Sequence, residues 1–112
     1  MKNLKLVINN NKNENYFFNK YELKLILNLY AKMVSGGEWK DYGLTISSKE
    51  VSFNIYRRAS EFPIYKIKKY FKPKNKYQRY IIHDSANKII NNSENLYSLI
   101  NNITWKKLRL VN

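Results

Sequence analysis

Residues 42–56 read YGLTISSKEVSFNIY, and this stretch predicts a β-hairpin. Apolar side chains alternate with polar or small ones over 42–46 and again over 51–55, which is the period of a strand with one buried face. Residues 47–50 are polar and can turn the chain between the two runs. The hairpin therefore predicts an antiparallel sheet with one apolar face.

The sequence after the hairpin extends this sheet. Three further strands are expected at 64–70, 77–83 and 88–90. Tyr65 and Ile67 are expected to point inward. Residues 72–76, KPKNK, form a charged turn, and 84–87, DSAN, form the turn before the last strand.

Two amphipathic helices flank the predicted strands. Asn19 is a favoured N-cap, and Glu22 three residues later completes a capping box. The helix should end at Gly36-Gly37, where glycine can adopt a left-handed conformation. Ser93 is the expected N-cap of the second helix.

These elements predict an α+β fold with an N-terminal helix, an antiparallel sheet of about four or five strands, and a C-terminal helix on the same sheet face. Residues 1–17 form a flexible or strand-like N-terminal segment, and 18–112 form a single domain. The side chains expected in the core are Leu23, Ile26, Leu27, Tyr30, Val34, Leu44, Ile46, Phe53, Ile55, Ile67, Leu96, Ile100 and Leu110.

The chain is strongly basic, with 21 Lys and Arg against 8 Asp and Glu and a formal net charge of +13. AT-rich coding would raise Lys, Asn, Ile, Tyr and Phe together, so the charge has an explanation without a partner. The charge still attracts nucleic acid or an anionic membrane surface. The chain has no Cys, which excludes disulfides and thiolate sites and favours a reducing, intracellular compartment. Nothing in the sequence indicates a transmembrane segment.

Residues that could carry catalysis are few. His83 is the single histidine and stands beside Asp84, but adjacent residues of a strand point to opposite faces. The carboxylates are scattered, and no phosphate-binding glycine loop is present. We therefore expect no enzymatic activity, no metal and no cofactor.

A basic and aromatic stretch is more informative. No acidic residue occurs between Glu61 and Asp84. Lysine for phosphates together with exposed rings for bases is the chemistry of single-stranded nucleic-acid binding. The alternative is that the lysines solvate an edge hairpin. The candidate nucleic-acid-binding residues, with the Arg57-Arg58 pair included, are Arg57, Arg58, Lys66, Lys68, Lys69, Tyr70, Lys72, Lys74, Lys76, Arg79 and Tyr80.

The Arg57-Arg58 pair has two interpretations. Arginine is rare in this chain, and its planar fork binds anions in a way that lysine does not. One of the two could instead form a structural salt bridge with Glu61 or Glu38.

Several short sequence motifs at fixed spacing resemble those of a known family. They are Gly37-Glu38-Trp39-Lys40-Asp41-Tyr42, residues 56–67 (YRRASEFPIYKI), the helix end at Met33-Val34 with Gly36-Gly37, and residues 107–111 (KLRLV). Together they resemble, over roughly 18–111, an alphaproteobacterial family of short proteins described as a domain of unknown function. The resemblance implies no catalytic residue, and it implies a location in the bacterial cytoplasm or the mitochondrial matrix. It also implies an Arg-rich loop where residues 72–76 are Lys-based here, so a basic loop at this position is not simply AT bias.

Three functions follow in order of support. The first is a non-catalytic binding domain for RNA or single-stranded DNA. The second is a structural accessory subunit of a larger respiratory, ribosomal or other protein assembly, docking through Trp39, Trp105 and exposed aromatic residues. The third, with the least support, is an enzyme that uses His83. The oligomeric state does not follow from the sequence.

Overall fold

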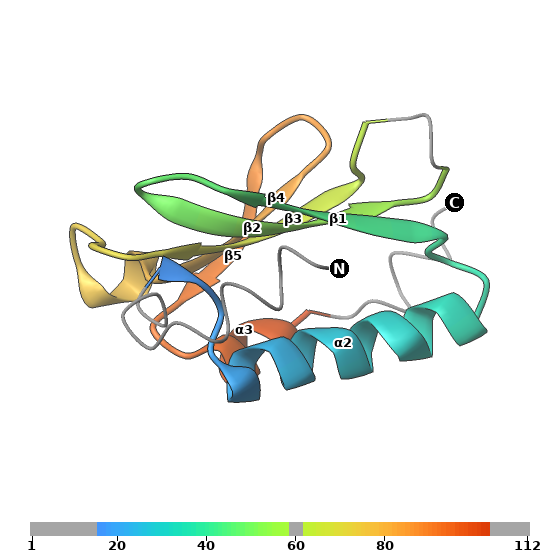
Figure 1. The fold of residues 1–112 in the computed structure, drawn as a ribbon, viewed down its shortest axis with the longest axis horizontal. Helices are drawn as coiled ribbons and strands as arrows, with labels where there is room; N and C mark the ends of the chain where they lie inside the picture. Colours follow the sequence, from blue (N-terminus) through green and yellow to red (C-terminus); the bar gives the residue numbers. More distant parts are fainter. Residues whose placement is uncertain (1–15, 59–61, 104–112) are drawn as a thin grey trace.

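A computed structural model describes residues 16–58 and 62–103. The described chain is an α+β fold whose two helices pack against one face of a five-stranded sheet (Figure 1). The fold class predicted from the sequence is therefore confirmed. The strand-like run at 4–8 and the apolar C-terminal residues, Leu110 among them, lie outside the described residues.

The sheet is an antiparallel meander in which each strand pairs with its neighbours in the chain, in the order β1-β2-β3-β4-β5. The strands are β1 (Asp41–Ile46), β2 (Glu50–Tyr56), β3 (Tyr65–Tyr70), β4 (Tyr80–Asp84) and β5 (Ile89–Ser93). The hairpin at 42–56 forms as predicted, with Leu44 opposite Phe53. The register shifts between Ile82 and His83, where β4 meets β5.

Helix α2 (Lys20–Ser35) begins and ends where the sequence predicts. The Asn19 side chain accepts from the backbone N–H of Glu22, and the Glu22 carboxylate accepts from the backbone N–H of Asn19, both at 2.8 Å. At the other end Gly37 has φ of 80°. Its N–H donates to the carbonyl of Val34, and the N–H of Glu38 donates to that of Met33, the paired bonds of a Schellman motif.

Two segment boundaries differ from the prediction. The fourth strand starts at Tyr80 rather than 77, because the Asn75 side chain accepts from the N–H of Tyr77 and starts a 3₁₀ turn, η2 (Lys76–Gln78). Helix α3 (Leu96–Asn101) is capped by Asn95, whose side chain accepts from the N–H of Ser98, and not by Ser93. Ser93 instead ends β5.

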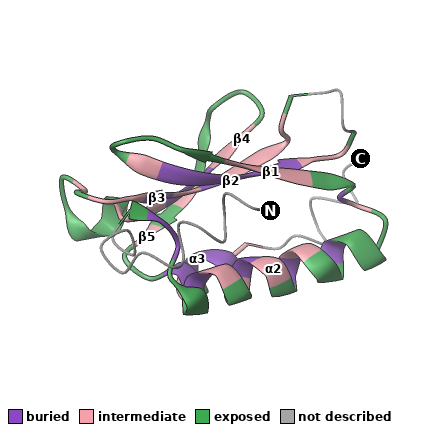
Figure 2. Ribbon diagram, in the orientation of Figure 1, coloured by how far each residue is buried: buried purple, intermediate pink, exposed green. Residues whose placement is uncertain are grey.

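The core lies between the helices and the inner face of the sheet (Figure 2). Phe53, Ile55, Ile67 and Leu99 are fully buried. Phe17 and Phe18, just before α2, also belong to the core, although the sequence placed Phe17 in the N-terminal segment.

Helix α2 packs along Glu22, Ile26, Leu29 and Met33. Val34, predicted to be buried, is 40% exposed because it lies one residue beyond this seam at the last turn. Ile46, also predicted to be buried, is 49% exposed because it ends an edge strand that has a neighbour on one side only.

The opposite face of the sheet, here called the outer face, carries polar side chains. Ser52 and Asn54 of β2 are buried there. The Ser52 hydroxyl donates to the Asn54 side-chain oxygen at 2.6 Å, and the Asn54 amide donates to the Thr45 hydroxyl at 3.3 Å. The buried polar side chains of β2 on the outer face are therefore hydrogen-bonded within the sheet.

Candidate nucleic-acid interface

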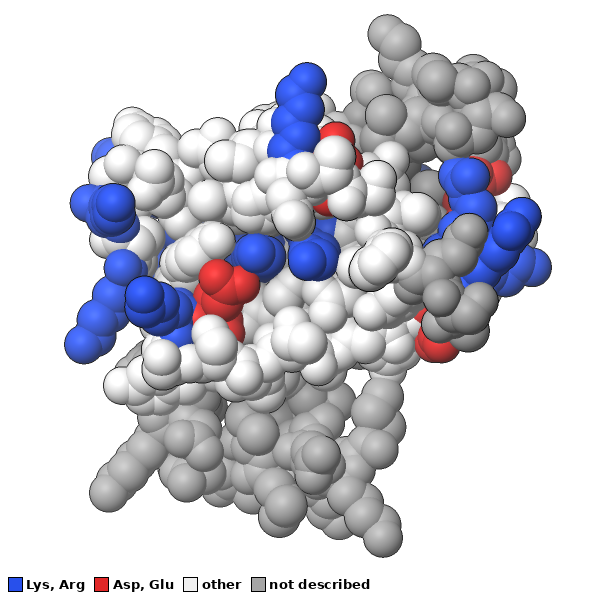
Figure 3. All heavy atoms as spheres, turned by 90° about the horizontal axis from the view of Figure 1, so that it is seen from above, with Lys and Arg blue, Asp and Glu red and all other residues white. Residues whose placement is uncertain are grey.

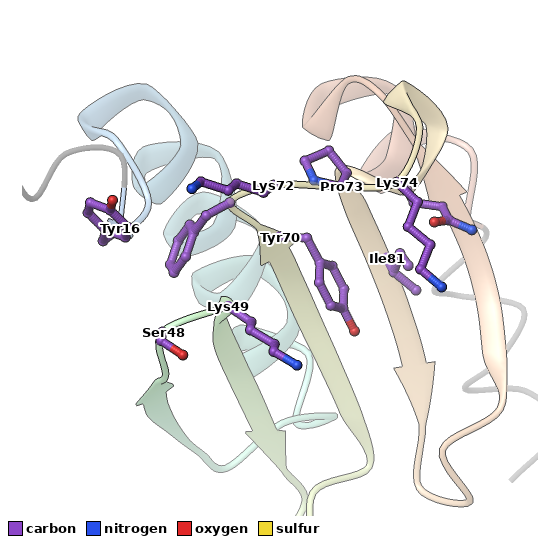
Figure 4. A pocket seen from close by; sticks show the side chains of 10 residues that line it. Tyr16, Ser48, Lys49, Tyr70, Lys72, Pro73, Lys74 and Ile81 are labelled. Atoms are coloured by element: carbon purple, nitrogen blue, oxygen red, sulfur yellow. The ribbon is translucent and has the colours of Figure 1, made fainter.

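A groove of about 810 Å³ opens at one end of the sheet. It lies between the β1–β2 turn and the connection from β3 to β4 (Figure 4). Its lining residues are Tyr16, Ser48, Lys49, Tyr70, Phe71, Lys72, Pro73, Lys74, Gln78 and Ile81. The groove thus joins three parts of the chain that are remote in sequence, and we call it the end groove.

Local hydrogen bonds hold the two main walls of the end groove together. The Ser47 hydroxyl accepts from the N–H groups of Lys49 and Glu50, each at 3.2 Å, which fixes the β1–β2 turn. The N–H of Phe71 donates to the carbonyl of Lys49 at 3.0 Å and ties this turn to the β3–β4 connection. The lysines and rings of the groove therefore project from a braced backbone.

The aromatic side chains of the groove offer two ring surfaces. Tyr16 and Phe71 meet edge to face with their centroids 5.3 Å apart, and Tyr16 is 46% exposed. Tyr70 is half-buried. Burial, followed by the neighbouring Glu50 carboxylate and a hydrogen bond to it, raises the pKa of the Tyr70 phenol. The Tyr70 phenol is therefore neutral at physiological pH, and its ring lines the groove.

The cations of the groove are Lys49, Lys72 and Lys74, all of them exposed. None of the described residues that line the groove is acidic. The nearest carboxylate along the chain, Glu50, pairs with Lys68 at 3.2 Å on the outer face. Basic side chains stand at both ends and in the middle of the outer face (Figure 3), and at this end three of them line the groove.

The structure brings three of the predicted site residues into the end groove: Tyr70, Lys72 and Lys74. Lys66 and Lys68 lie on the outer face of β3 and are half-buried. The Lys76 ammonium lies over the Tyr77 ring, 5.2 Å from its centroid, and Arg79 is half-buried before β4.

Arg57 and Arg58 follow the far end of β2, at the opposite end of the sheet from the groove. Glu61, one of the two partners considered for this pair, lies outside the described residues.

Two predicted site residues, Lys69 and Tyr80, are wrongly assigned to a binding surface. Both lie on the inner face of the sheet, against the start of α2. The Lys69 ammonium donates to a Glu22 carboxylate oxygen at 2.8 Å and to the carbonyl of Phe17 at 2.9 Å. The Tyr80 hydroxyl donates to the other oxygen of Glu22. Strand alternation turns both side chains toward the helix. There Lys69 neutralises the buried Glu22 carboxylate, and Tyr80 donates a hydrogen bond to it.

Trp39 is also reassigned. It was expected to dock on a partner, but it is 2% exposed and packs near Tyr30 and Tyr65 in the core. Trp105 lies outside the described residues.

The site predicted from the sequence did not include seven of the groove residues: Tyr16, Ser48, Lys49, Phe71, Pro73, Gln78 and Ile81. Tyr16 and Lys49 are far in sequence from the basic stretch, and only the packing of the N-terminal approach and the β1–β2 turn brings them to it. A lysine in a hairpin turn was the single local signal, and it is common to turns of every function.

His83 stands on the outer face, opposite Lys66 of β3. Burial, followed by the Lys68 ammonium, lowers the pKa of the imidazole. Asp84 does not orient it, because its Oδ1 accepts from the N–H groups of Ala86 and Lys88 in the following turn. Among the described residues there is no group of three or more side chains that could hold a metal ion.

The fold and the groove define a small α+β domain with a basic, aromatic-lined groove at one end of its sheet. The chain belongs to a family described as protein of unknown function (DUF2794), whose model matches residues 16–100. This confirms the resemblance to a family of unknown function. Comparison with curated proteins and with solved structures gave no match. In the part of the chain described, no helix has the length and apolarity needed to cross a membrane.

Proposed function

We propose that this protein is a non-catalytic domain that binds RNA or single-stranded DNA in the end groove. The observation that supports the proposal is the convergence of aromatic rings and three lysines in one groove, with no acidic residue among the described residues that line it. Lysines neutralise phosphates, and exposed rings stack on bases, which are accessible only in a single strand.

The three groove lysines set an expected salt dependence. Each phosphate neutralised releases condensed counterions, so binding of a single strand should weaken with a log–log slope of about −0.7 per contact. Three contacts give a slope of about −2. The net charge of the chain adds a long-range attraction that depends on salt too, so a charge-matched control is needed to isolate the groove.

The test compares two triple variants that change the net charge equally. One carries Lys49→Glu, Lys72→Glu and Lys74→Glu in the groove. The other carries Lys24→Glu, Lys40→Glu and Lys88→Glu, at exposed positions that do not line it. The groove variant should lose binding to an oligonucleotide in fluorescence anisotropy, while the control keeps most of it and both retain the circular dichroism of the parent. Equal losses in the two variants would contradict the proposal, because long-range charge would then explain the binding.

A role as accessory subunit of a protein assembly is the second candidate. Large apolar or aromatic side chains stand exposed outside the groove, with Tyr21 63%, Phe62 87% and Tyr97 55% accessible. Docking through such side chains would depend much less on salt than binding to phosphates. A complex from the native organism that survives both nuclease and high salt would favour this second candidate.

A further inference from the structure

Rings and ammonium groups alternate along the end groove. In Figure 4, Tyr16, Lys49, Tyr70 and Lys74 succeed one another across the groove, and Lys72 points back toward Tyr16. The Tyr16 ring is joined by Phe71 at 5.3 Å. The Tyr70 ring is joined by Ile81, whose side chain lies between Tyr70 and Lys74 in the same view. Along the groove, the pair of rings is therefore followed by two ammonium groups, then by the Tyr70 ring with its aliphatic neighbour, and then by a third ammonium group.

The same alternation occurs along a single nucleic-acid strand, where each base is separated from the next by a phosphate. We propose, on the basis of the function proposed above, that the end groove binds a two-nucleotide unit of single strand. One base stacks at Tyr16 and Phe71, and the next at Tyr70. The phosphate between them meets Lys49 and Lys72, and the following phosphate meets Lys74.

The size of the groove agrees with a unit this short. Its volume of about 810 Å³ lies within the roughly 300–1,000 Å³ typical of sites for small organic ligands. Such a groove holds a few nucleotides and excludes a duplex, whose bases are stacked within the helix and offer no free face. Ser48 and Gln78 supply neutral hydrogen-bonding groups that can contact either base or sugar.

The experiment is a length series measured by isothermal titration calorimetry with 5′-phosphorylated oligothymidylates, from one nucleotide up to about eight. Affinity should rise steeply, by roughly tenfold or more, from one to two nucleotides, because the second base gains a ring to stack on. Each nucleotide beyond the second should add much less. A dinucleotide that lacks both bases but keeps its phosphates should bind no better than the mononucleotide.

Two tyrosine variants test which rings produce the gain in affinity between one and two nucleotides. Tyr16→Ala or Tyr70→Ala should remove the gain between one and two nucleotides, a loss of roughly 5- to 150-fold. Tyr97→Ala removes an exposed ring of α3, outside the groove, and should leave the series unchanged. Circular dichroism checks that each variant is folded.

The outcomes separate this proposal from the function on which it rests. A mononucleotide that binds as tightly as the dinucleotide, or a step that first occurs at four nucleotides or more, would overturn the two-nucleotide unit while the groove lysines still control binding. An octanucleotide that does not bind, or binds equally to both triple lysine variants, would overturn the nucleic-acid function itself.

Discussion

Lys68 and Lys69 are neighbours in β3, yet their side chains lie on opposite faces of the sheet and pair with different carboxylates. Lys69 points to the inner face, where its side chain is 7% exposed and pairs with Glu22 at 2.8 Å. Lys68 points to the outer face and pairs with Glu50 at 3.2 Å, with 18% of its side chain exposed. The basic and aromatic stretch therefore contains two groups of side chains, one that holds the sheet against α2 and one that lies on the outer face.

Tyrosines divide in the same way. Tyr80 donates to Glu22 beneath the sheet, and Tyr70 bonds to Glu50 beside the groove. Each face thus holds a carboxylate with a lysine and a tyrosine, and the two clusters differ chiefly in burial. Because a buried charge without a partner is far more costly than an exposed one, equal substitutions on the two faces should have unequal effects.

The largest expected difference in the free energy of unfolding is that between the Lys69 and Lys68 variants. Lys69→Met removes the cation from a buried carboxylate and should lower the free energy of unfolding by about 3–5 kcal/mol. Lys68→Met breaks a more accessible pair and should cost about 0–1 kcal/mol. Urea denaturation of the two variants measures both values. Similar losses would show that burial does not separate the two faces.

A second substitution, at Glu22, tests whether the unpaired carboxylate causes the loss of stability. Adding Glu22→Gln to Lys69→Met removes the unpaired charge and should recover part of the stability. If the double variant is no more stable than Lys69→Met, the loss comes from packing of the lysine stem rather than from an uncompensated carboxylate.

A smaller effect is expected for the tyrosines. Tyr80→Phe removes a hydrogen bond to a buried carboxylate and should cost about 1.5–3 kcal/mol, the range for bonds to charged groups. Burial, followed by the hydrogen bond with Glu22, raises the pKa of the Tyr80 phenol, so it stays a donor at neutral pH. Tyr70→Phe, the matched change at the groove, should cost less because Glu50 stays accessible to water. Thermal unfolding of both variants compares their losses of stability. A larger loss for Tyr70→Phe would contradict the view that the inner-face cluster is the more stabilising of the two.

Local signals in the sequence predicted most of the fold. The capping box of Asn19 and Glu22, the glycine pair after α2 and the alternation of the 42–56 hairpin all act within a few residues, and all appear in the structure. The second role of Glu22, as partner of Lys69, depends on a residue 47 positions away and has no local signal.

The candidate site was only partly predictable. The alternation that places Ile67 inward also places Lys69 inward, so its assignment to a binding surface could have been avoided from the sequence. Tyr16 and Lys49 could not have been found in this way, because the end groove exists only after the segment before α2, the β1–β2 turn and the β3–β4 connection have packed together.

The smallest expected effect is the contribution of His83, on the outer face, to the pH dependence of the free energy of unfolding. His83 lies there near Lys66, Lys68, Glu50 and Asp84, and among the described side chains none bonds to its buried Nδ1. Burial and then Lys68 lower its pKa from the ordinary value of 6.5, so the folded protein favours the neutral imidazole.

The unfolded chain therefore takes up a proton at His83 at a higher pH than the folded chain does. It follows that the free energy of unfolding should fall as pH drops below about 6.5, before Asp and Glu with ordinary pKa values begin to titrate. Urea denaturation at about pH 7 and about pH 5 should show this fall in the parent and a smaller one in His83→Gln, which cannot be protonated. Lys68→Met should reduce the fall as well, because it removes the cation that disfavours a charged imidazole. A parent protein that gains stability at the lower pH, or a His83→Gln variant with an unchanged pH dependence, would show that the outer face does not disfavour the charged imidazole.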